Sequence, residues 1–509
     1  MIKTDKAPLF AVIDIGSGQI GLKIAQLSLQ TGKLTILEDV TKSIPLGRDT
    51  FSTGRISTNM LDLLCQALGG FRQLMREYKV RRYKAVATSA FREARNREYV
   101  LEQIKIRTNL NVDILTRSQE RYYMQLAVRR NIEGFDKLRK EGLLVLNVGA
   151  GTLQLSGYGK SGLVYNQSFQ LGSLRVRQLL SSIEDNSLQF PKVLEEYVLT
   201  HIGSQEYPYT HFAATGSVIE ALLSYNILSD KNTKADFDKN YERLIYMPTQ
   251  AMTSRLRIDN EHARSVVPTL ILLHTFWSRL EASSLLCPKC SMAGGILLEI
   301  AGNLSSTPDD SFEEEILSGA RLMAGQYTKD EKHVEDVLSK ATLLFDKLAK
   351  SHGLTQRGRL LLQLAVLFHE TGKAISMSEY ENYSAMLTAS SDIIGLAADE
   401  EKMVELLVRY HEGPEPGDHD DVYMSLSHKN RMLVSKLIAI LQIACAMDAS
   451  HRQKLMDPQI KISEDKLRIR VIPKESFLLE RWAFERHTAF FFDVFGLEPQ
   501  LRLQKEGSK

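Results

Sequence analysis

Cysteine is scarce in this chain, with four among 509 residues. Four cysteines are too few for a scaffold built on disulfides. Cys287 and Cys290 have CxxC spacing, but a structural zinc site needs a second such pair, and the sequence contains none. We therefore expect these two thiols to be ordinary core residues rather than a redox or metal site.

Long hydrophobic runs are also missing. The longest apolar stretch, residues 265–277, contains Pro268 and His274 and falls short of the about 18 apolar residues that a membrane span needs. Near the start of the chain, Asp14 interrupts the apolar run too early for a secretion signal. These observations predict a cytoplasmic protein that does not bind membranes.

Charge of one sign is lacking as well: 64 lysine and arginine residues face 62 acidic ones. A net charge of +2 does not favour a protein that binds duplex nucleic acid through overall charge. Residues 72–140 nevertheless carry 18 basic and 8 acidic side chains, so this segment has a local excess of +10. It has few interleaved aromatic residues, which disfavours a base-stacking platform and leaves a multiply charged anion as the expected partner.

The composition is that of a folded globular protein, with 43% hydrophobic and 25% charged residues. The length predicts about three or four domains. Within it, residues 12–26 (VIDIGSGQIGLKIAQ) and residues 145–159 (VLNVGAGTLQLSGYG) align without a gap. Each copy has the pattern of a β-hairpin with a glycine-rich turn.

The glycines of the two turns pair in this alignment, Gly16 with Gly149 and Gly18 with Gly151. Glycine permits positive φ and lets backbone amides approach an anion closely. Two matching turns predict paired α/β halves that hold phosphate in a cleft. The alternative is that both hairpins serve packing alone.

The segment ATSAFREARNR at residues 87–97, together with Asp14-Ile-Gly-Ser-Gly18, gives the chain a family resemblance. It resembles the exopolyphosphatase/guanosine-pentaphosphatase (Ppx/GppA) family of the actin/sugar-kinase/Hsp70 superfamily, and the similarity extends over nearly the whole chain. The resemblance implies an α/β fold of duplicated actin-like, ribonuclease-H-like lobes, followed by an all-α HD-like domain and a small α+β domain. The domains implied are an actin-like lobe I at 1–132, lobe II at 133–305, the helical domain at 306–455 and the small domain at 456–509.

The resemblance also implies roles for single residues. Glu120 falls on the family's catalytic base, and Arg92 on an arginine that contacts phosphate in the cleft. Phosphoryl transfer depends mainly on charge neutralisation and an in-line water, which suits such a pair. Taken alone, however, Glu120 could only favour the N-terminal end of a helix, and Arg92 could be a solvated arginine. The implied phosphate-binding residues are Asp14, Gly16, Ser17, Gly18, Gly149, Ala150, Gly151 and Thr152.

The second motif departs from the family pattern. Asn147 and Gln154 stand where the family has carboxylates that hold a metal, and Gln119 replaces a glutamate. Amide oxygens can bind Mg²⁺, the cofactor that the resemblance implies, but a hard cation prefers carboxylates. Phosphate binding with weakened turnover is therefore expected.

The C-terminal half has the periodicity of long helices. His333, the pair His369-Glu370, and Asp448 follow the order H…HD…D of an HD-type metal site, with Glu in place of one Asp. Buried or surface histidines that bind no metal are the alternative. Where the family has an HxxHS segment, this chain has tyrosines at 380 and 383, whereas His411 is retained.

The tail is expected to form a strand, an amphipathic helix that ends at Gly496, and a last strand. Residues 490–495 are expected in the core or in a subunit contact, and the resemblance implies a homodimer. The leading hypothesis is a hydrolase that releases terminal phosphate from polyphosphate or guanosine pentaphosphate. The alternatives are a non-catalytic regulator that binds the same ligands and, third, a kinase of the same superfamily.

Overall fold

The computed structural model describes residues 8–28, 34–160, 162–179, 189–202, 208–304 and 311–503. The chain forms two compact units that divide at residues 310 and 311. This division lies close to the expected boundary between 305 and 306. The finer division into four domains stays a prediction, although each half of the first unit has a sheet and a hydrophobic core of its own.

The first half of unit one is a five-stranded sheet in the order β3-β2-β1-β4-β5. β1 pairs antiparallel with β2 and parallel with β4. Apolar residues of β1 such as Ile13 and Ile15 share a core with α2 and α4. The elements are β1 (Leu9–Ile15), β2 (Gln19–Leu27), β3 (Leu34–Ser43), α1 (Leu46–Thr53), α2 (Thr58–Glu77), β4 (Arg82–Ala87), α3 (Ser89–Glu93), α4 (Arg97–Thr108), β5 (Asp113–Ile114) and α5 (Arg117–Asn131).

The second half repeats this topology in a six-stranded sheet ordered β10-β11-β9-β6-β7-β8. β6 pairs antiparallel with β7 and parallel with β9, as β1 pairs with β2 and β4. The expected duplication is thus confirmed at the level of strand pairing. The elements are α6 (Phe135–Gly142), β6 (Leu143–Val148), β7 (Leu153–Gly159), β8 (Gly162–Phe169), α7 (Ser173–Leu179), α9 (Phe190–Ile202), β9 (His211–Thr215), α10 (Ser217–Ser224), β10 (Lys231–Thr233), α11 (Lys234–Leu244), α12 (Thr249–Leu256), α13 (Asn260–Trp277) and β11 (Ser284–Leu286).

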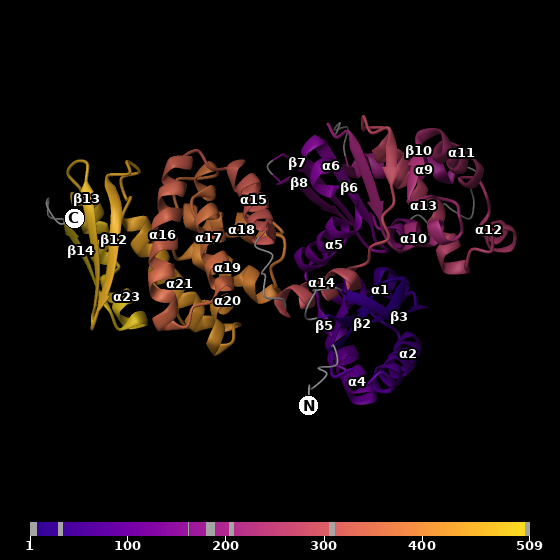
Figure 1. The fold of residues 1–509 in the computed structure, drawn as a ribbon, viewed down its shortest axis with the longest axis horizontal. Helices are drawn as coiled ribbons and strands as arrows, with labels where there is room; N and C mark the ends of the chain where they lie inside the picture. The colour runs from indigo at the N-terminus through magenta and orange to yellow at the C-terminus, as the bar shows by residue number, and fades with distance from the viewer. Residues whose placement is uncertain are drawn as a thin grey trace, which may run out of the picture. The chain divides into compact units, whose positions relative to one another are not determined.

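Helix α14 (Met292–Leu304) follows the second sheet in the chain but packs against α5 and β1 of the first half (Figure 1). The contact is close: a Cβ on Gly295 would lie 1.8 Å from the carbonyl oxygen of Tyr123. Glycine is therefore required at this position, and α14 ties the end of unit one back to its first sheet.

Unit two is a helical array with a three-stranded sheet, β12-β13-β14 (Figure 1). α21 contacts α16, α17 and α19, and its residues from Leu437 to Ala446 are all buried. The elements are α15 (Ser311–Gly325), α16 (Glu331–His352), α17 (Gln356–Phe368), η1 (Thr371–Ala374), α18 (Tyr380–Ser390), α19 (Ala398–Arg409), α20 (Asp421–Met424), α21 (His428–Ala446), β12 (Leu455–Ser463), β13 (Lys466–Pro473), α22 (Leu478–Arg486), α23 (Thr488–Phe495) and β14 (Glu498–Leu503).

The tail has the expected order of strand, helical segment and strand, but the helical segment consists of two helices, α22 and α23, that meet at His487. The helix does end at Gly496, whose φ of 66° suits glycine. Phe491 and Phe495 are buried, whereas Phe492 is exposed.

Candidate active site

The two glycine turns are closed by the same hydrogen bond. The amide of Gly16 donates to the carbonyl oxygen of Gln19, and the amide of Gly149 donates to that of Thr152, both at 2.9 Å. These two amides are therefore already used within the turns. The positive φ that glycine permits is not used in these turns, because none of Gly16, Gly18, Gly149 and Gly151 has it.

Close approach is what requires glycine here. A Cβ on Gly151 would lie 2.6 Å from the Oγ of Ser89, and one on Gly16 would lie 2.9 Å from the carbonyl oxygen of Gln19. The turns also face each other, since a Cβ on Gly18 would lie 3.7 Å from the Cβ of Ala150. The repeat therefore brings the two predicted phosphate turns into contact.

A small cavity of about 30 Å³ lies where the turns meet, with Gly18 and Ala150 among its lining residues. In the described part of the chain, the amides of Ser17, Gly18, Ala150 and Gly151 donate to no protein acceptor. The Ser17 hydroxyl, in contrast, contacts the Oγ of Ser89 and accepts from the amide of Ala90. The amides, and not the serine hydroxyl, are thus available to an anion.

Arg92 and Glu120, which are far apart in the sequence, form an ion pair. Arg92, in α3, donates from Nη1 to the carboxylate of Glu120 at 2.8 Å and to the carbonyl oxygen of Leu115 at 2.7 Å. Glu120 lies in the first turn of α5, and the capping box of Thr116 and Gln119 fixes where that helix starts. The Nε and Nη2 atoms of Arg92 are buried without a hydrogen-bond partner. Half of the guanidinium is therefore ready for another acceptor.

Two carboxyl groups of this region ionise with difficulty. Burial, reinforced by the charge of Glu120, raises the pKa of Asp14 to about 7. Burial also raises the pKa of Glu120, while Arg92 opposes this shift. The Oδ1 atom of Asp14 is buried and unpartnered. Perturbed carboxyl groups beside an incompletely paired arginine are typical of functional sites.

A third carboxyl group, Glu220 in α10, was not singled out from the sequence. Its pKa is raised to about 7, mainly by burial, with Lys23 opposing the shift. Nothing in its sequence context distinguishes it from the other glutamates, because burial is set by the packing of α10 in the second half.

Asn147 and Gln154 lie opposite each other on β6 and β7. Asn147 Nδ2 donates to Gln154 Oε1 at 3.2 Å, and Thr215 Oγ1 donates to Asn147 Oδ1 at the same distance. Two carboxylates at these positions would repel each other unless a cation lay between them, whereas these amides satisfy one another. The pair therefore does not fit a Mg²⁺ ion as a ligand set.

The two halves are joined beside the turns by Arg175 of α7. Its Nη2 contacts both carboxylate oxygens of Glu93 at 2.6 and 2.7 Å, and its Nε donates to the carbonyl oxygen of Gly151 at 2.9 Å. Its guanidinium also lies over the ring of Phe51. Sequence reasoning missed this bridge; Glu93 lies next to Arg92 in the quoted motif, but nothing in the sequence indicated its partner.

In unit two, the residues predicted as HD-type ligands separate into two groups. His333, His369 and Glu370 have ligand atoms within 4.8 Å of one another. The carboxylate of Asp448 instead contacts Nδ1 of His333 at 2.8 Å, on the opposite side of the ring. His451, which was not predicted, stacks on His333 with 3.7 Å between ring centroids. Its position three residues after Asp448 was the only sequence signal.

His411 lies near this group but has both nitrogens engaged. Its Nδ1 contacts the carbonyl oxygen of Val408 at 2.7 Å, and its Nε2 contacts the hydroxyl of Tyr380 at 3.2 Å. Tyr380 occupies the position of the first histidine in the family's HxxHS segment, so the tyrosine now partners the histidine that remains.

The duplicated sheets and their facing turns define the fold as actin-like. The chain belongs to the Ppx/GppA phosphatase family: the family's sequence profile matches residues 26–303, and the profile of the family's domain III matches residues 318–485. Among the described helices, none combines the length and apolar character needed to cross a lipid bilayer.

Individual relatives are distant. The chain is similar to an exopolyphosphatase 1 of Mycobacterium leprae, with 29% identity over 28% of this chain and 41% of the relative. It is also similar to a bifunctional 3-dehydroquinate synthase/phosphatase of Fusobacterium nucleatum, with 23% identity over 33% of this chain and 26% of the relative. These matches span less than half of each curated relative.

Among solved structures, an exopolyphosphatase from Cytophaga hutchinsonii aligns with 58% of this chain and 100% of its own, at a TM-score of 0.51 and 17% identity. This similarity supports the actin-like fold of the chain.

Proposed function

We propose that the first unit hydrolyses the terminal anhydride of inorganic polyphosphate and releases orthophosphate. The observation that carries this proposal is the pair of Arg92 and Glu120, with two buried guanidinium nitrogens that have no protein partner. A buried, half-used guanidinium binds a phosphoryl oxygen well, because it has already lost its water. Exopolyphosphatases among the relatives agree with this substrate.

Each residue has a definite part in the proposed reaction. Nε and Nη2 of Arg92 bind oxygens of the terminal phosphoryl group, and the available amides of Ser17, Gly18, Ala150 and Gly151 bind the next phosphates. Glu120 accepts a proton from the water that attacks the terminal phosphorus, and the bridging P–O bond breaks. Because Arg92 contacts only one oxygen of Glu120, the other is left for that water. A positioned base of this kind contributes about 10²–10⁴-fold in rate.

Polyphosphate is favoured over guanosine pentaphosphate by charge. The carboxyl group of Glu120 interacts electrostatically with Arg92, Arg117 and Arg121, and each of these arginines lowers its pKa. These arginines belong to the segment 72–140, which carries the excess of +10. A long polyanion gains more from such a field than a short nucleotide. Guanosine pentaphosphate remains the second substrate to test, because it presents the same terminal anhydride.

A non-catalytic regulator that binds the same ligands is the second candidate, and the pair of Asn147 and Gln154 favours it. This pair satisfies its own hydrogen bonds without a cation. The Mg²⁺ requirement that the resemblance implies is therefore proposed to be weak. The homodimer that the resemblance implies stays a prediction, which analytical ultracentrifugation can test by measuring the mass of the particle in solution.

The test measures binding and phosphate release separately on the purified full chain. Long-chain polyphosphate and guanosine pentaphosphate are each incubated with the protein, with and without Mg²⁺, and orthophosphate is followed. Release from polyphosphate supports the hydrolase. Binding without release under every condition assigns the regulatory function instead. If the protein shows no binding and no release, both functions are refuted.

A further inference from the structure

Two imidazole nitrogens face each other in the helical unit. His333 lies in the first turn of α16, and His369 directly follows α17. Their Nε2 atoms are 3.3 Å apart. The Nδ1 atom of His333 contacts the carboxylate of Asp448 at 2.8 Å, and that of His369 contacts the carbonyl oxygen of Val366 at 2.6 Å.

These outer partners fix the tautomers. A carbonyl oxygen can only accept a hydrogen bond, and so can an ionised carboxylate, so each Nδ1 carries a hydrogen; when a ring is neutral, its Nε2 carries a lone pair. The two lone pairs of His333 and His369 thus point toward the same space. Two acceptors at this distance repel each other unless a proton or a metal ion lies between them.

The spacing matches a tetrahedral metal site. With metal–nitrogen bonds of about 2.0–2.1 Å, two ligands of a tetrahedral ion lie roughly 3.3 Å apart. The Nε2 atoms of His333 and His369 have this separation, and a carboxylate oxygen of Glu370 lies 3.7 Å from Nε2 of His333. All three residues are at least nine-tenths buried.

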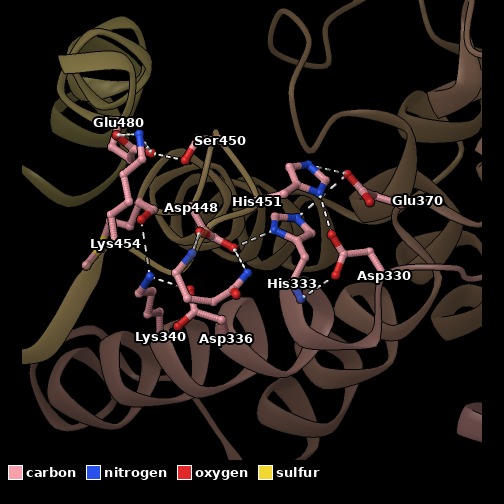
Figure 2. A network of polar contacts seen from close by, with 12 residues as sticks. Asp330, His333, Asp336, Lys340, Glu370, Asp448, Ser450, His451, Lys454 and Glu480 are labelled. Atoms are coloured by element: carbon pink, nitrogen blue, oxygen red, sulfur yellow. Dashed lines mark hydrogen bonds and ion pairs between the residues drawn. The ribbon is translucent and has the colours of Figure 1, made fainter. Parts of the chain in front are cut away.

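The surroundings resemble the outer partners that orient metal-bound histidines. Such histidines usually donate their second nitrogen to a carboxylate or a backbone carbonyl, which is the arrangement of Asp448 and Val366 here. Asp448 is itself held by Gln453, through the backbone amide and the side chain. Figure 2 shows His333 between Asp448 on one side and His451 with Glu370 on the other.

We propose that His333, His369 and Glu370 bind one divalent transition-metal ion of the zinc class, which ties α16 to the end of α17. Two imidazoles and one carboxylate suit such an ion and do not suit Mg²⁺ or Ca²⁺. Asp448 is a positioning residue that acts through His333. Because the ligands are buried, the role assigned to the ion is structural. This site is independent of the phosphate cleft and of the function proposed for it.

Two side chains that already contact Glu370 compete with the ion for its carboxylate. Lys373 forms an ion pair with the carboxylate of Glu370, and His451 Nε2 lies 3.3 Å from the same carboxylate. The ring of His451 is stacked on that of His333 at 9°, so its nitrogen cannot point at the same ion. Lys373 and His451 are partly exposed and form the side from which an ion enters.

The experiment uses the full chain after chelator treatment, titrated with Zn²⁺ and, in parallel, with Co²⁺. We expect one ion per chain. At a zinc concentration of about 100 times Kd, we expect the melting temperature of unit two to rise by about 5–10 °C. Bound Co²⁺ is expected to show a visible spectrum of nitrogen and oxygen ligands without a thiolate charge-transfer band, which excludes Cys287 and Cys290 as the binding residues.

Three variants and one control test the ligand set. Glu370→Gln is expected to lose zinc binding at least 10-fold, and Asp448→Asn, which retains all three ligands, is expected to lose 10–100-fold. Lys373→Met is expected to tighten binding, because it removes the competing cation from Glu370. His411→Gln replaces a nearby buried histidine outside the ligand set, and its zinc affinity is expected to equal that of the wild type.

The outcomes that overturn the proposal are distinct. They are the absence of stoichiometric zinc binding to the wild type, unchanged affinity in both Glu370→Gln and Asp448→Asn, or a thiolate band with Co²⁺. Should a variant fail to fold, Lys373→Met still decides, because a tighter site supports Glu370 as a ligand and an unchanged one refutes it.

Discussion

Asp14 provides the sharpest test of the electrostatics of the cleft. Its carboxyl group is buried, has an unpartnered oxygen, and has a pKa raised to about 7 from the ordinary 3.8. We expect Asp14→Asn to remove this cost of ionisation and, at the same time, to impair phosphate binding. The protein would then become relatively more stable at alkaline pH while it loses function.

The magnitude follows from linkage. One pKa unit corresponds to about 1.4 kcal/mol, so the shift of Asp14 costs about 4 kcal/mol once the group is ionised in both states. The native state holds the proton more tightly than the unfolded chain, so the unfolding free energy falls as pH rises from about 4 to about 7 and then levels off. Between about pH 5 and pH 8, the stability of Asp14→Asn relative to the wild type should rise by about 3 kcal/mol.

The assay can report on unit one alone, because the chain has two tryptophans, one in each unit. Trp277 is 2% exposed in the core of the second sheet, whereas Trp482 is 57% exposed. In a Trp482→Phe background, urea denaturation followed by fluorescence therefore reports Trp277. Asp62→Asn, which removes an exposed carboxylate of α2, is the matched control and should change stability by no more than about 0.5 kcal/mol at either pH.

The comparison between the two pH values carries the test. A buried asparagine also has polar atoms to satisfy, which shifts the stability of Asp14→Asn equally at both pH values and cancels in the difference. A relative stability of Asp14→Asn that stays constant between about pH 5 and pH 8 would show that Asp14 ionises normally, and the account of the cleft as a buried acidic site would be refuted.

Three further predictions concern the site and its frame. The double change Asn147→Asp with Gln154→Glu should increase both turnover and Mg²⁺ dependence in an orthophosphate assay, because it restores a carboxylate pair that needs a cation; unchanged values would sink the account of this pair. Glu93→Gln leaves Arg175 without its charged partner, so the Michaelis constant for polyphosphate should change several-fold, whereas an unaltered constant would show that the bridge has no bearing on the cleft. Gly295→Ala brings a Cβ into the backbone of α5 and should lower the free energy of unfolding by several kcal/mol, as measured by urea denaturation with Trp277 fluorescence; wild-type stability would contradict the close packing of α14.

Much of the fold could be predicted because the duplication is visible as short, local sequence patterns. The two hairpins, the helix that contains Glu120 and the glycine stop at Gly496 all depend on neighbours within a few residues. The break between α22 and α23 was missed, since residues on both sides of His487 continue a helical pattern.

The contacts between distant segments could not be predicted. α14 follows the second sheet but packs on the first, and only a glycine at 295 hints at the close approach. The bridge from Arg175 to Glu93 and the neighbours of Glu370 depend on side chains far apart in the sequence. The order of His333, His369 and Asp448 was found by resemblance, but which nitrogen each partner would contact depends on ring orientation, which only packing decides.

The central claim is that Glu120, held beside Arg92, acts as the base that activates water at a bound phosphate chain. The most direct test compares orthophosphate release and polyphosphate binding in the wild type and in Glu120→Gln, with Glu133→Gln as an exposed control. The account predicts that all three proteins bind polyphosphate, and that release falls by about 10²–10⁴-fold in Glu120→Gln only. Release at the wild-type rate from Glu120→Gln would contradict it.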